Sequence, residues 1–256
     1  MTAAAFGWLT ARPIAHRGLH DAARGRVENT LGAAQAAIAG GFAIECDVRL
    51  SSDGEAVVFH DATLDRLMRA SGAVGRRTVG ELRGLRFKAT SERIPTLPEF
   101  LADLAGKVPL ICEIKSRFDG DTRLADRVAT LAAEYAGPLA LKSFDPEVIA
   151  QLRASGLAKP LGIVAEASYE GDYWRELRAD QKQDCAAFLH YPRTRPDFLS
   201  WHVDDLPHPT PALLRALAAL PVMVWTVRTA EQKRLARLWA DQIVFEGAAG
   251  EASFDP

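Results

Sequence analysis

The sequence predicts an α/β fold of the (β/α)8 TIM-barrel class, and three observations carry this prediction. Short apolar segments, typical of strands buried on both faces, alternate with Ala- and Leu-rich segments of helical character. Eight such alternations fill 256 residues, the size of one such barrel. We find no low-complexity tract, long linker or solenoid repeat, so we expect a single domain over residues 1–256. The expected strands are Ile14–Ala15, Ala43–Val48, Leu110–Lys115, Leu139–Phe144, Leu161–Ala165, Ala186–His190, Val222–Val227 and Gln242–Phe245.

Start and stop signals mark three of the helices between these strands. The segment Thr30–Ala39 ends at a pair of glycines, a common helix stop. Asp145-Pro146 has the residue types that favour an N-cap and a first helical position, for a helix that continues to Ala154. Thr229-Ala-Glu-Gln232 has the spacing of a capping box. A doubly wound open sheet is the alternative arrangement of the same elements.

One connection is too short for a crossover helix. Parallel strands need about a dozen or more connecting residues, and fewer than that are available between Asp47 and His60 after the strand ends. Asp53-Gly54 is a strong signal for a two-residue hairpin turn. That turn sets a register in which Asp47 faces His60, so we expect the two side chains to be close neighbours. The polar, Arg- and Gly-rich residues 61–95 are expected to form a small cap inserted after the second strand.

Charge and composition exclude several classes of protein. The 31 Lys and Arg residues against 33 Asp and Glu give a net charge of -2, so we expect no binding to nucleic acid. No apolar run approaches the roughly 18 residues of a membrane helix, and the first residues lack the pattern of a secretory signal. Three scattered cysteines suit a reducing compartment, so we expect a cytoplasmic protein. The sequence indicates no oligomeric state.

Acidic residues share one face of two expected strands. Glu45 and Asp47 alternate with apolar neighbours, and Glu113 and Lys115 repeat the pattern in a later strand. Carboxylates gathered in a closed interior repel one another and lose hydration, and a divalent cation resolves both problems. An all-oxygen ligand set favours Mg²⁺ or Ca²⁺ over Zn²⁺. Ion pairs with Arg and Lys are the alternative interpretation. Cys46, between the two acids, is expected to face the outer helices.

Two histidines directly follow expected strands. His16 precedes Arg17, whose guanidinium suits a phosphate, and Gly18, which permits a sharp turn. His60 ends the second arm of the expected hairpin. Because imidazole titrates near neutral pH, the pair could act as general acid and general base. A hydrogen-bonded core histidine is the alternative for either one. We expect the remaining histidines to be structural, and His190 is the first candidate among them for contact with substrate.

Six short motifs follow one another in a specific order and spacing. They are His16-Arg17-Gly18, Glu28-Asn29-Thr30, Glu45-x-Asp47-Val48, Val57-Val58-x-His60-Asp61, Glu113-Ile114-Lys115 and Trp225-Thr226-Val227. This ordered set resembles the glycerophosphodiester phosphodiesterases across most of the chain. The resemblance also favours the barrel over the open sheet.

The resemblance implies hydrolysis of a small-molecule glycerophosphodiester to sn-glycerol 3-phosphate and an alcohol. It implies one divalent cation, Mg²⁺ or Ca²⁺, held by Glu45, Asp47 and Glu113, and acid–base catalysis by His16 and His60. The substrate-binding residues that it implies are Arg17, Lys115, Trp225, Glu28 and Asn29. A lysophospholipase D or phospholipase D-like enzyme on the same barrel, and a non-catalytic phosphate-binding barrel, are the alternatives.

The chain departs from the family pattern near its end. Arg228 follows Trp-Thr-Val where Asn is usual, and the last strand runs into Glu246-Gly where an Ile-Thr-Asp-like segment is typical. Because of these departures, the resemblance does not identify the alcohol group of the substrate. Arg76-Arg77, in the expected cap, is most simply a solvated loop, with recognition of an anionic head group as the alternative.

Overall fold

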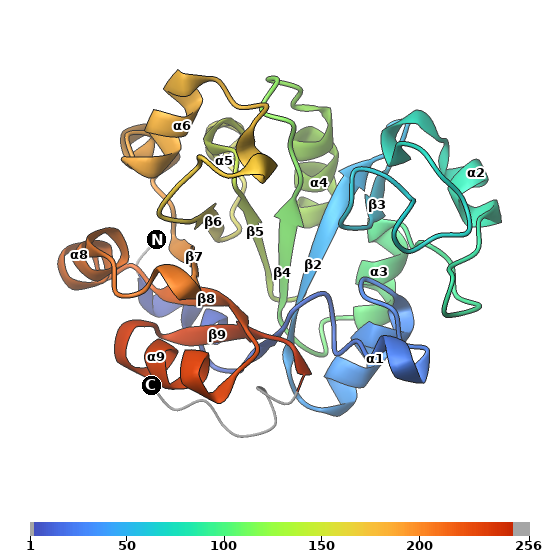
Figure 1. Ribbon diagram of the computed structural model, residues 1–256, viewed down its shortest axis with the longest axis horizontal. Helices are drawn as coiled ribbons and strands as arrows, with labels where there is room; N and C mark the ends of the chain where they lie inside the picture. Colours follow the sequence, from blue (N-terminus) through green and yellow to red (C-terminus); the bar gives the residue numbers. More distant parts are fainter. Residues whose placement is uncertain (1–2, 248–256) are drawn as a thin grey trace.

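The computed structural model describes residues 3–247, which form a closed barrel of eight parallel strands (Figure 1). Each strand pairs with the next, and β1 pairs with both β2 and β9, which closes the sheet and excludes the open alternative. The parallel strands are β1 (Ile14–Ala15), β2 (Ala43–Leu50), β4 (Leu110–Ile114), β5 (Leu139–Ser143), β6 (Leu161–Ala165), β7 (Phe198–His202), β8 (Val222–Val227) and β9 (Gln242–Phe245). The antiparallel β3 (Ala56–Val58) extends the sheet beside β2.

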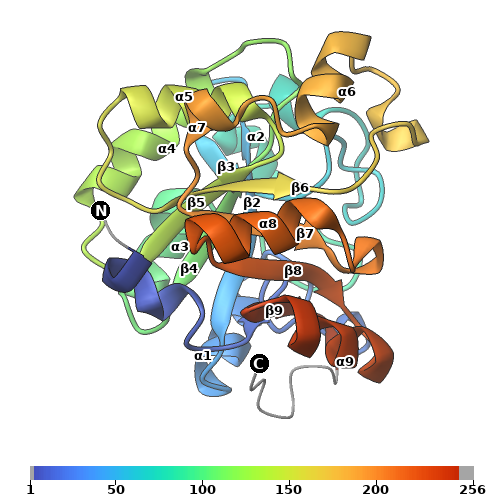
Figure 2. The same cartoon turned by 90° about the vertical axis from the view of Figure 1, so that its left-hand side faces the viewer.

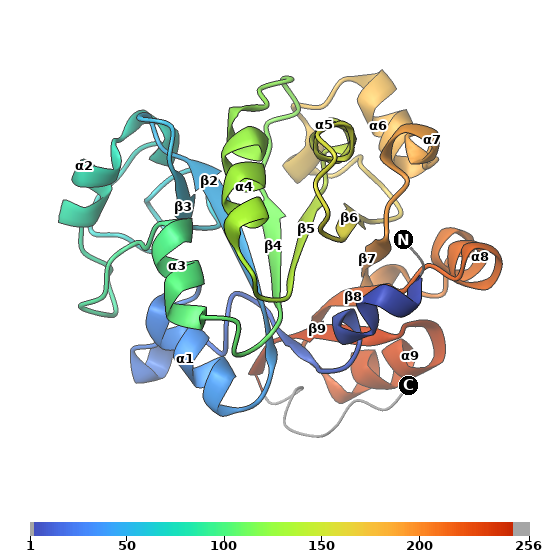
Figure 3. The ribbon, with the colours of Figure 1, turned by 180° about the vertical axis from the view of Figure 1, so that it is seen from behind.

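Helices surround the barrel, and Figure 3 shows α3 and α4 on its outer side, where α4 packs against β4 and α3 against β3. The α-helices are α1 (Leu31–Ala39), α2 (Val79–Gly84), α3 (Leu97–Leu104), α4 (Arg123–Glu134), α5 (Pro146–Ala154), α6 (Ala179–Ala186), α7 (Tyr191–Thr194), α8 (Pro209–Ala218) and α9 (Ala230–Trp239). Single 3₁₀ segments are η1 (Ala3–Leu9), η2 (Ala22–Arg24), η3 (Val74–Arg76), η4 (Asp172–Trp174) and η5 (Val203–Asp205). Within residues 3–247, no helix combines the length and apolar character needed to cross a membrane.

The three predicted helix starts are confirmed by their caps. The Thr30 side chain accepts a hydrogen bond from the Ala33 amide, and Asp145 does the same for Glu147. Thr229 forms the complete capping box with Gln232. Each cap satisfies amides that the first helical turn leaves without a partner.

The barrel interior is apolar at the amino ends of the strands and polar at their carboxyl ends. Ile111 of β4 and Met223 of β8 lie in the apolar layer, and Leu9 of η1 covers it from below. Figure 2 shows β7, β8 and β9 side by side, with α8 and α9 across them. Cys46 lies in the layer between strands and helices, as predicted. The polar residues are therefore concentrated at one end of the barrel.

The predicted strand at 186–190 is wrong. α6 extends to Ala186, Phe188 takes a left-handed conformation (φ 55°), and His190 precedes the short α7. The strand at this place in the barrel is β7, whose apolar sequence is interrupted by the buried Ser200. A short apolar run does not by itself distinguish a strand from a helical turn.

The hairpin is present, but the predicted register is wrong by one residue. Val48 lies opposite Val58, so Asp47 faces Phe59, whose amide donates to the Asp47 carbonyl at 2.9 Å. The loop contains three residues instead of two, because Gly54 adds a left-handed residue (φ 87°) after the turn. His60 is the next residue along and still reaches the mouth of the barrel.

Residues 61–95 pack against β3 at the side of the barrel (Figure 1). They form a small apolar cluster of their own, in which Leu64, Met68 and Phe87 join Phe59 of the hairpin. That the segment is a small cap inserted into one domain stays a prediction. Arg76 of the segment reaches a cavity at the carboxyl end of the strands.

Candidate active site

A cavity of about 380 Å³ opens at the carboxyl ends of the strands, the end where TIM barrels place their active sites. It brings together residues from both ends and the middle of the sequence. The sequence-predicted residues that line it are His16, Arg17, His60, Glu113, Lys115 and Trp225. Glu45 and Asp47 lie beneath it in the barrel, as their contacts with His16, Arg17 and Lys115 show.

The three predicted metal ligands converge. Glu45, Asp47 and Glu113 are almost completely buried, and one oxygen of each lies within 4.8 Å of the others. The strand register explains this convergence: Asp47 on β2 lies directly opposite Glu113 on β4. Alternation along β2 then directs Glu45 to the same interior face. We refer to these three residues as the carboxylate triad.

Two buried lysines neutralise the carboxylate triad. The Lys115 ammonium lies 2.8 Å from Asp47 Oδ1 and also contacts Glu113. Lys142 lies 3.1 Å from Glu45 Oε1 and 3.4 Å from Glu113 Oε2. Lys142 is not among the site residues predicted from the sequence, although a lone lysine in the apolar segment Leu139–Phe144 is unusual. In the strand register, Lys142 of β5 lies opposite Glu113.

These contacts favour the ionised forms of Asp47 and Glu113. Burial alone would raise the pKa of Asp47, but Lys115, His60 and Arg17 together hold that pKa well below its ordinary value. Burial also opposes ionisation of Glu113, and Lys115 and Lys142 lower its pKa in the same way. The pKa of Lys115 is raised, because Asp47 and Glu113 outweigh the cost of burying its charge. Asp47, Glu113 and Lys115 are therefore charged at neutral pH.

The triad has the donor set for a divalent cation. Glu45 Oε1 and Asp47 Oδ1 are buried and accept no hydrogen bond, even though a lysine nitrogen lies near each one. Their lone pairs are thus incompletely satisfied by the protein itself. Three carboxylates with oxygen atoms this close fit the ligand chemistry of Mg²⁺ or Ca²⁺.

Asn29 and Glu28 hold other site residues in place and do not line the cavity. The Asn29 side chain donates to Asp47 Oδ2 at 2.9 Å and accepts from the Asp47 amide at 3.2 Å. Glu28 accepts a hydrogen bond from Arg17 at 2.7 Å. Both residues therefore act through Asp47 and Arg17 in this structure.

The turn after β1 places His16 against the triad. His16 Nε2 lies 3.9 Å from Glu45 Oε2, and the Arg17 amide donates to the same oxygen at 3.1 Å. Gly18 makes this turn possible, because its φ is 79° and a Cβ there would lie 2.8 Å from the Ala33 carbonyl carbon.

Each predicted catalytic histidine has a carboxylate at its Nδ1 atom. Glu246 Oε1 lies 2.6 Å from His16 Nδ1, and Asp61 Oδ1 lies 2.7 Å from His60 Nδ1. Such a partner fixes the orientation of the ring and directs Nε2 away from the carboxylate. Neither carboxylate is predicted as a site residue from the sequence, although Asp61 directly follows His60.

Glu246 also forms an ion pair with Arg228, with 2.7 Å between Arg228 Nε and Glu246 Oε2. Hydrogen bonds from His16, His20 and Arg228 outweigh burial and lower the pKa of Glu246. The two departures from the family pattern noted above thus contact one another. The sequence alone does not predict this ion pair, because it depends on how the fold places the two residues.

A chain of ion pairs links the two sides of the cavity. Arg17 contacts Glu28, and Glu28 accepts two hydrogen bonds from Arg66 at 2.7 and 2.8 Å. Arg66 also contacts Asp61 at 2.7 Å, which in turn holds His60. Since Arg66 and Asp61 belong to residues 61–95, the insertion contributes to the site.

Aromatic side chains form one wall of the cavity. The Trp225 indole donates to the Ser200 carbonyl at 3.0 Å and packs edge-on against Phe144, with ring centroids 5.4 Å apart. Tyr173 and Trp174 lie on the same wall. His190, by contrast, is buried beside Thr194 and lines none of the cavities described here.

A barrel that gathers buried acids, fixed cations and two histidines with carboxylate partners at its strand ends has the kind of polar centre that TIM-barrel enzymes use as an active site. The sequence model of the glycerophosphoryl diester phosphodiesterase family matches residues 16–246. The chain belongs to this family.

Individual relatives agree with this assignment. Glycerophosphodiester phosphodiesterase 1 of Mus musculus is 34% identical over 151 residues, which are 55% of this chain and 44% of the relative. A glycerophosphodiester phosphodiesterase of Caldanaerobacter subterraneus is 40% identical over 111 residues, 40% of this chain and 44% of that protein. The chain thus spans less than half the length of these curated relatives.

Solved structures share the fold. An Oleispira antarctica phosphodiesterase, in complex with the product sn-glycerol-3-phosphate, superposes with a TM-score of 0.75 at 23% identity, over 96% of this chain and 95% of that one. A glycerophosphodiester phosphodiesterase of Thermotoga maritima gives 0.68 at 24% identity, over 91% and 92% of the two chains.

Proposed function

We propose that the chain is a metal-dependent phosphodiesterase that hydrolyses glycerophosphodiesters to sn-glycerol 3-phosphate and an alcohol. The observation that carries this proposal is the position of His16 and His60 on a single cavity above the carboxylate triad. Membership of the family supports it. The product held by the Oleispira antarctica structure is the compound that this reaction would release.

Glu45, Asp47 and Glu113 would hold one divalent cation, Mg²⁺ or Ca²⁺. When bound, the cation supplies positive charge that offsets the charge of the diester and polarises its phosphoryl group. Lys115 and Lys142 lower the pKa of Glu113, and Lys115 lowers that of Asp47, which favours the ionised form that binds a cation.

Arg17 and Lys115 would bind the phosphate oxygens. Both line the cavity, and Arg17 Nε is a buried donor without a hydrogen bond in the structure. Glu28 and Asp47 restrain the Arg17 side chain from below, so its guanidinium is oriented before substrate arrives. Fixed cations of this kind stabilise the extra negative charge of the transition state.

His16 and His60 would transfer protons. One imidazole accepts the proton of the attacking oxygen, and the other donates a proton to the departing alkoxide of the alcohol. Attack by the neighbouring glycerol hydroxyl gives a cyclic phosphate that water then opens, whereas attack by water gives the products directly. Both routes need the same two imidazoles, held by Glu246 and Asp61.

A lysophospholipid is a second candidate substrate, because the surroundings of the cavity are both charged and apolar. An adjoining cavity of about 730 Å³ shares His60 and Lys115 with the first. Its wall combines charged residues such as Arg49 with apolar ones such as Phe118 and Leu177. The charged part suits a polar alcohol, and the apolar part suits an acyl chain.

A turnover panel tests the proposal. The substrates are glycerophosphocholine, glycerophosphoethanolamine, glycerophosphoglycerol, a lysophospholipid and a chromogenic phosphodiester, each with Mg²⁺, with Ca²⁺ and with EDTA. We expect release of sn-glycerol 3-phosphate from the glycerophosphodiesters in the presence of metal. No release from any of them would refute the hydrolase, and undiminished release in excess EDTA would refute the metal dependence.

A further inference from the structure

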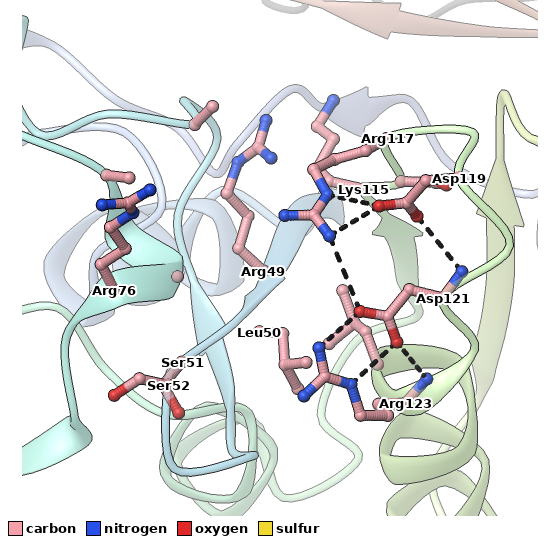
Figure 4. Close-up of a pocket in the computed structure, with 15 residues that line it drawn as sticks. Arg49, Leu50, Ser51, Ser52, Arg76, Lys115, Arg117, Asp119, Asp121 and Arg123 are labelled. Atoms are coloured by element: carbon pink, nitrogen blue, oxygen red, sulfur yellow. Dashed lines mark hydrogen bonds and ion pairs between the residues drawn. The ribbon is translucent and has the colours of Figure 1, made fainter.

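A second cavity, of about 300 Å³, lies beside the proposed catalytic centre and is strongly cationic (Figure 4). Five basic side chains line it against two acidic ones, although the whole chain carries a slight negative charge. The basic residues are Arg49, Arg76, Lys115, Arg117 and Arg123, and the acidic residues are Asp119 and Asp121.

The two carboxylates neutralise only one side of this cavity. Arg117 lies 2.6 Å from Asp119, and Arg123 lies 2.6 Å from Asp121. Figure 4 shows Arg49 between Arg76 and this group of ion pairs. Within the described part of the chain, neither Arg49 nor Arg76 forms an ion pair with a carboxylate. Their positive charges are therefore available to an anion.

Of Arg49 and Arg76, Arg49 has the more closely defined position. Its Nε donates to the His60 carbonyl at 2.6 Å, which fixes the base of the guanidinium beside the catalytic histidine. The Arg49 side chain is half-buried, and no carboxylate forms an ion pair with it within the described residues. Such a guanidinium is stabilised by an anionic partner.

The cationic cavity is continuous with the catalytic centre. Lys115, which would contact the scissile phosphate, lines this cavity as well as the first one. Arg49 lines both this cavity and the adjoining one that contains His60. Consider a diester whose phosphate lies at Lys115 and whose glycerol lies in the first cavity, beside Trp225. Its alcohol part would then extend past Arg49 towards Arg76.

We propose that Arg49 and Arg76 form an anion subsite for the alcohol part of the substrate. The enzyme would then prefer glycerophosphodiesters whose alcohol carries a further anionic group, such as a phosphate monoester. This inference rests on the proposed function and adds the substrate class to it. Two guanidinium groups match the charge and oxygen geometry of a phosphate monoester.

The test compares two substrates that differ by one phosphate group. These are glycerophosphoglycerol and the same diester phosphorylated on its second glycerol. We expect kcat/KM to be at least about tenfold higher for the phosphorylated substrate, since charge-assisted hydrogen bonds of this kind are each worth about a factor of ten. The preference should shrink as the salt concentration rises, because Arg76 is exposed.

Variants assign the preference to the two arginines. Arg76→Gln should remove most of the preference by raising KM for the phosphorylated substrate only. Arg49→Gln should lower the preference, the ratio of kcat/KM for the phosphorylated substrate to that for glycerophosphoglycerol, more than Arg76→Gln does. Loss of the Arg49 contact with His60 could slow both substrates, but such an effect cancels in the ratio. Arg86→Gln is the matched control, because it removes an exposed arginine of the same insertion that lines none of these cavities.

The outcomes separate this inference from the proposed function. Turnover of glycerophosphoglycerol without a preference for its phosphorylated form overturns the anion subsite alone. A preference for glycerophosphocholine over both substrates also overturns it, and would assign the arm to the aromatic Tyr173 and Trp174 instead. No turnover of any of the three refutes the hydrolase itself.

Discussion

The imidazoles of His16 and His60 are each held by a carboxylate at Nδ1, which leaves Nε2 for the cavity. We expect His16→Ala and His60→Ala each to lower kcat by about 10²–10⁴, the usual contribution of a positioned acid or base. Turnover of glycerophosphoglycerol measures the loss, and circular dichroism checks that the fold is retained.

His208→Ala is the matched control for these variants. It removes an imidazole outside the cavity, where the ring stacks on Trp201. We expect it to change kcat little. Near-normal turnover of both His16→Ala and His60→Ala would contradict the acid–base assignment.

The buried His190 makes the stability of the protein depend on pH. Burial lowers its pKa from an ordinary 6.5 to about 4. The folded state therefore favours the neutral ring, and this contribution to stability is complete above pH 6.5 and lost as the pH falls to about 4. The expected loss is about 3 kcal/mol, at about 1.4 kcal/mol for each pKa unit. Urea denaturation of the protein and of His190→Gln, from pH 7 to 4, measures it. Equal pH slopes for the two would contradict the prediction.

At the scale of single residues, the sequence predicts which side chains lie in the candidate site better than it predicts which residues contact them. His16, Asp47 and Glu113 could be identified because each follows or ends an apolar strand, and parallel strands bring their carboxyl ends together. Glu246 could not, because its role depends on β9 closing the barrel beside β1. Partnerships of this kind depend on strand register, which composition does not encode.

Among the elements, the turn after β1 makes the most specific demand on its sequence. We expect Gly18→Ala to lower the free energy of unfolding by about 1–3 kcal/mol, because alanine strains the positive φ and would contact Ala33. Thermal unfolding measures the effect. Gly84→Ala is the control, since Gly84 ends α2 with open space around it. Equal stability of the two variants would contradict the interpretation.

The elements also show where prediction from sequence fails. Caps such as Thr229 with Gln232 act within four residues, so their helices could be predicted. The strand expected at Ala186–His190 and the turn at Asp53-Gly54 failed for another reason. In both cases one left-handed residue, Phe188 or Gly54, changed the path of the chain. Gly54 adopts this conformation freely, whereas for Phe188 its cost is offset by the rest of the fold, which the local sequence does not reveal.

For the whole molecule, a bound cation should increase stability. Anything that binds only the folded state stabilises it by mass action, by about 2.7 kcal/mol when its concentration is 100 times its Kd. We expect Mg²⁺ or Ca²⁺ to raise the melting temperature, and EDTA to reverse the rise. Glu113→Gln should abolish the rise, because it removes one carboxylate of the triad. A rise of the same size in this variant would place the cation elsewhere.

The barrel is closed by the two ends of the described chain: β1 pairs with β9, and His16 receives its carboxylate from Glu246. During synthesis on a ribosome, His16 emerges early and waits for 230 further residues before it acquires this partner. A nascent chain therefore lacks the complete candidate site until residue 246 has left the exit tunnel.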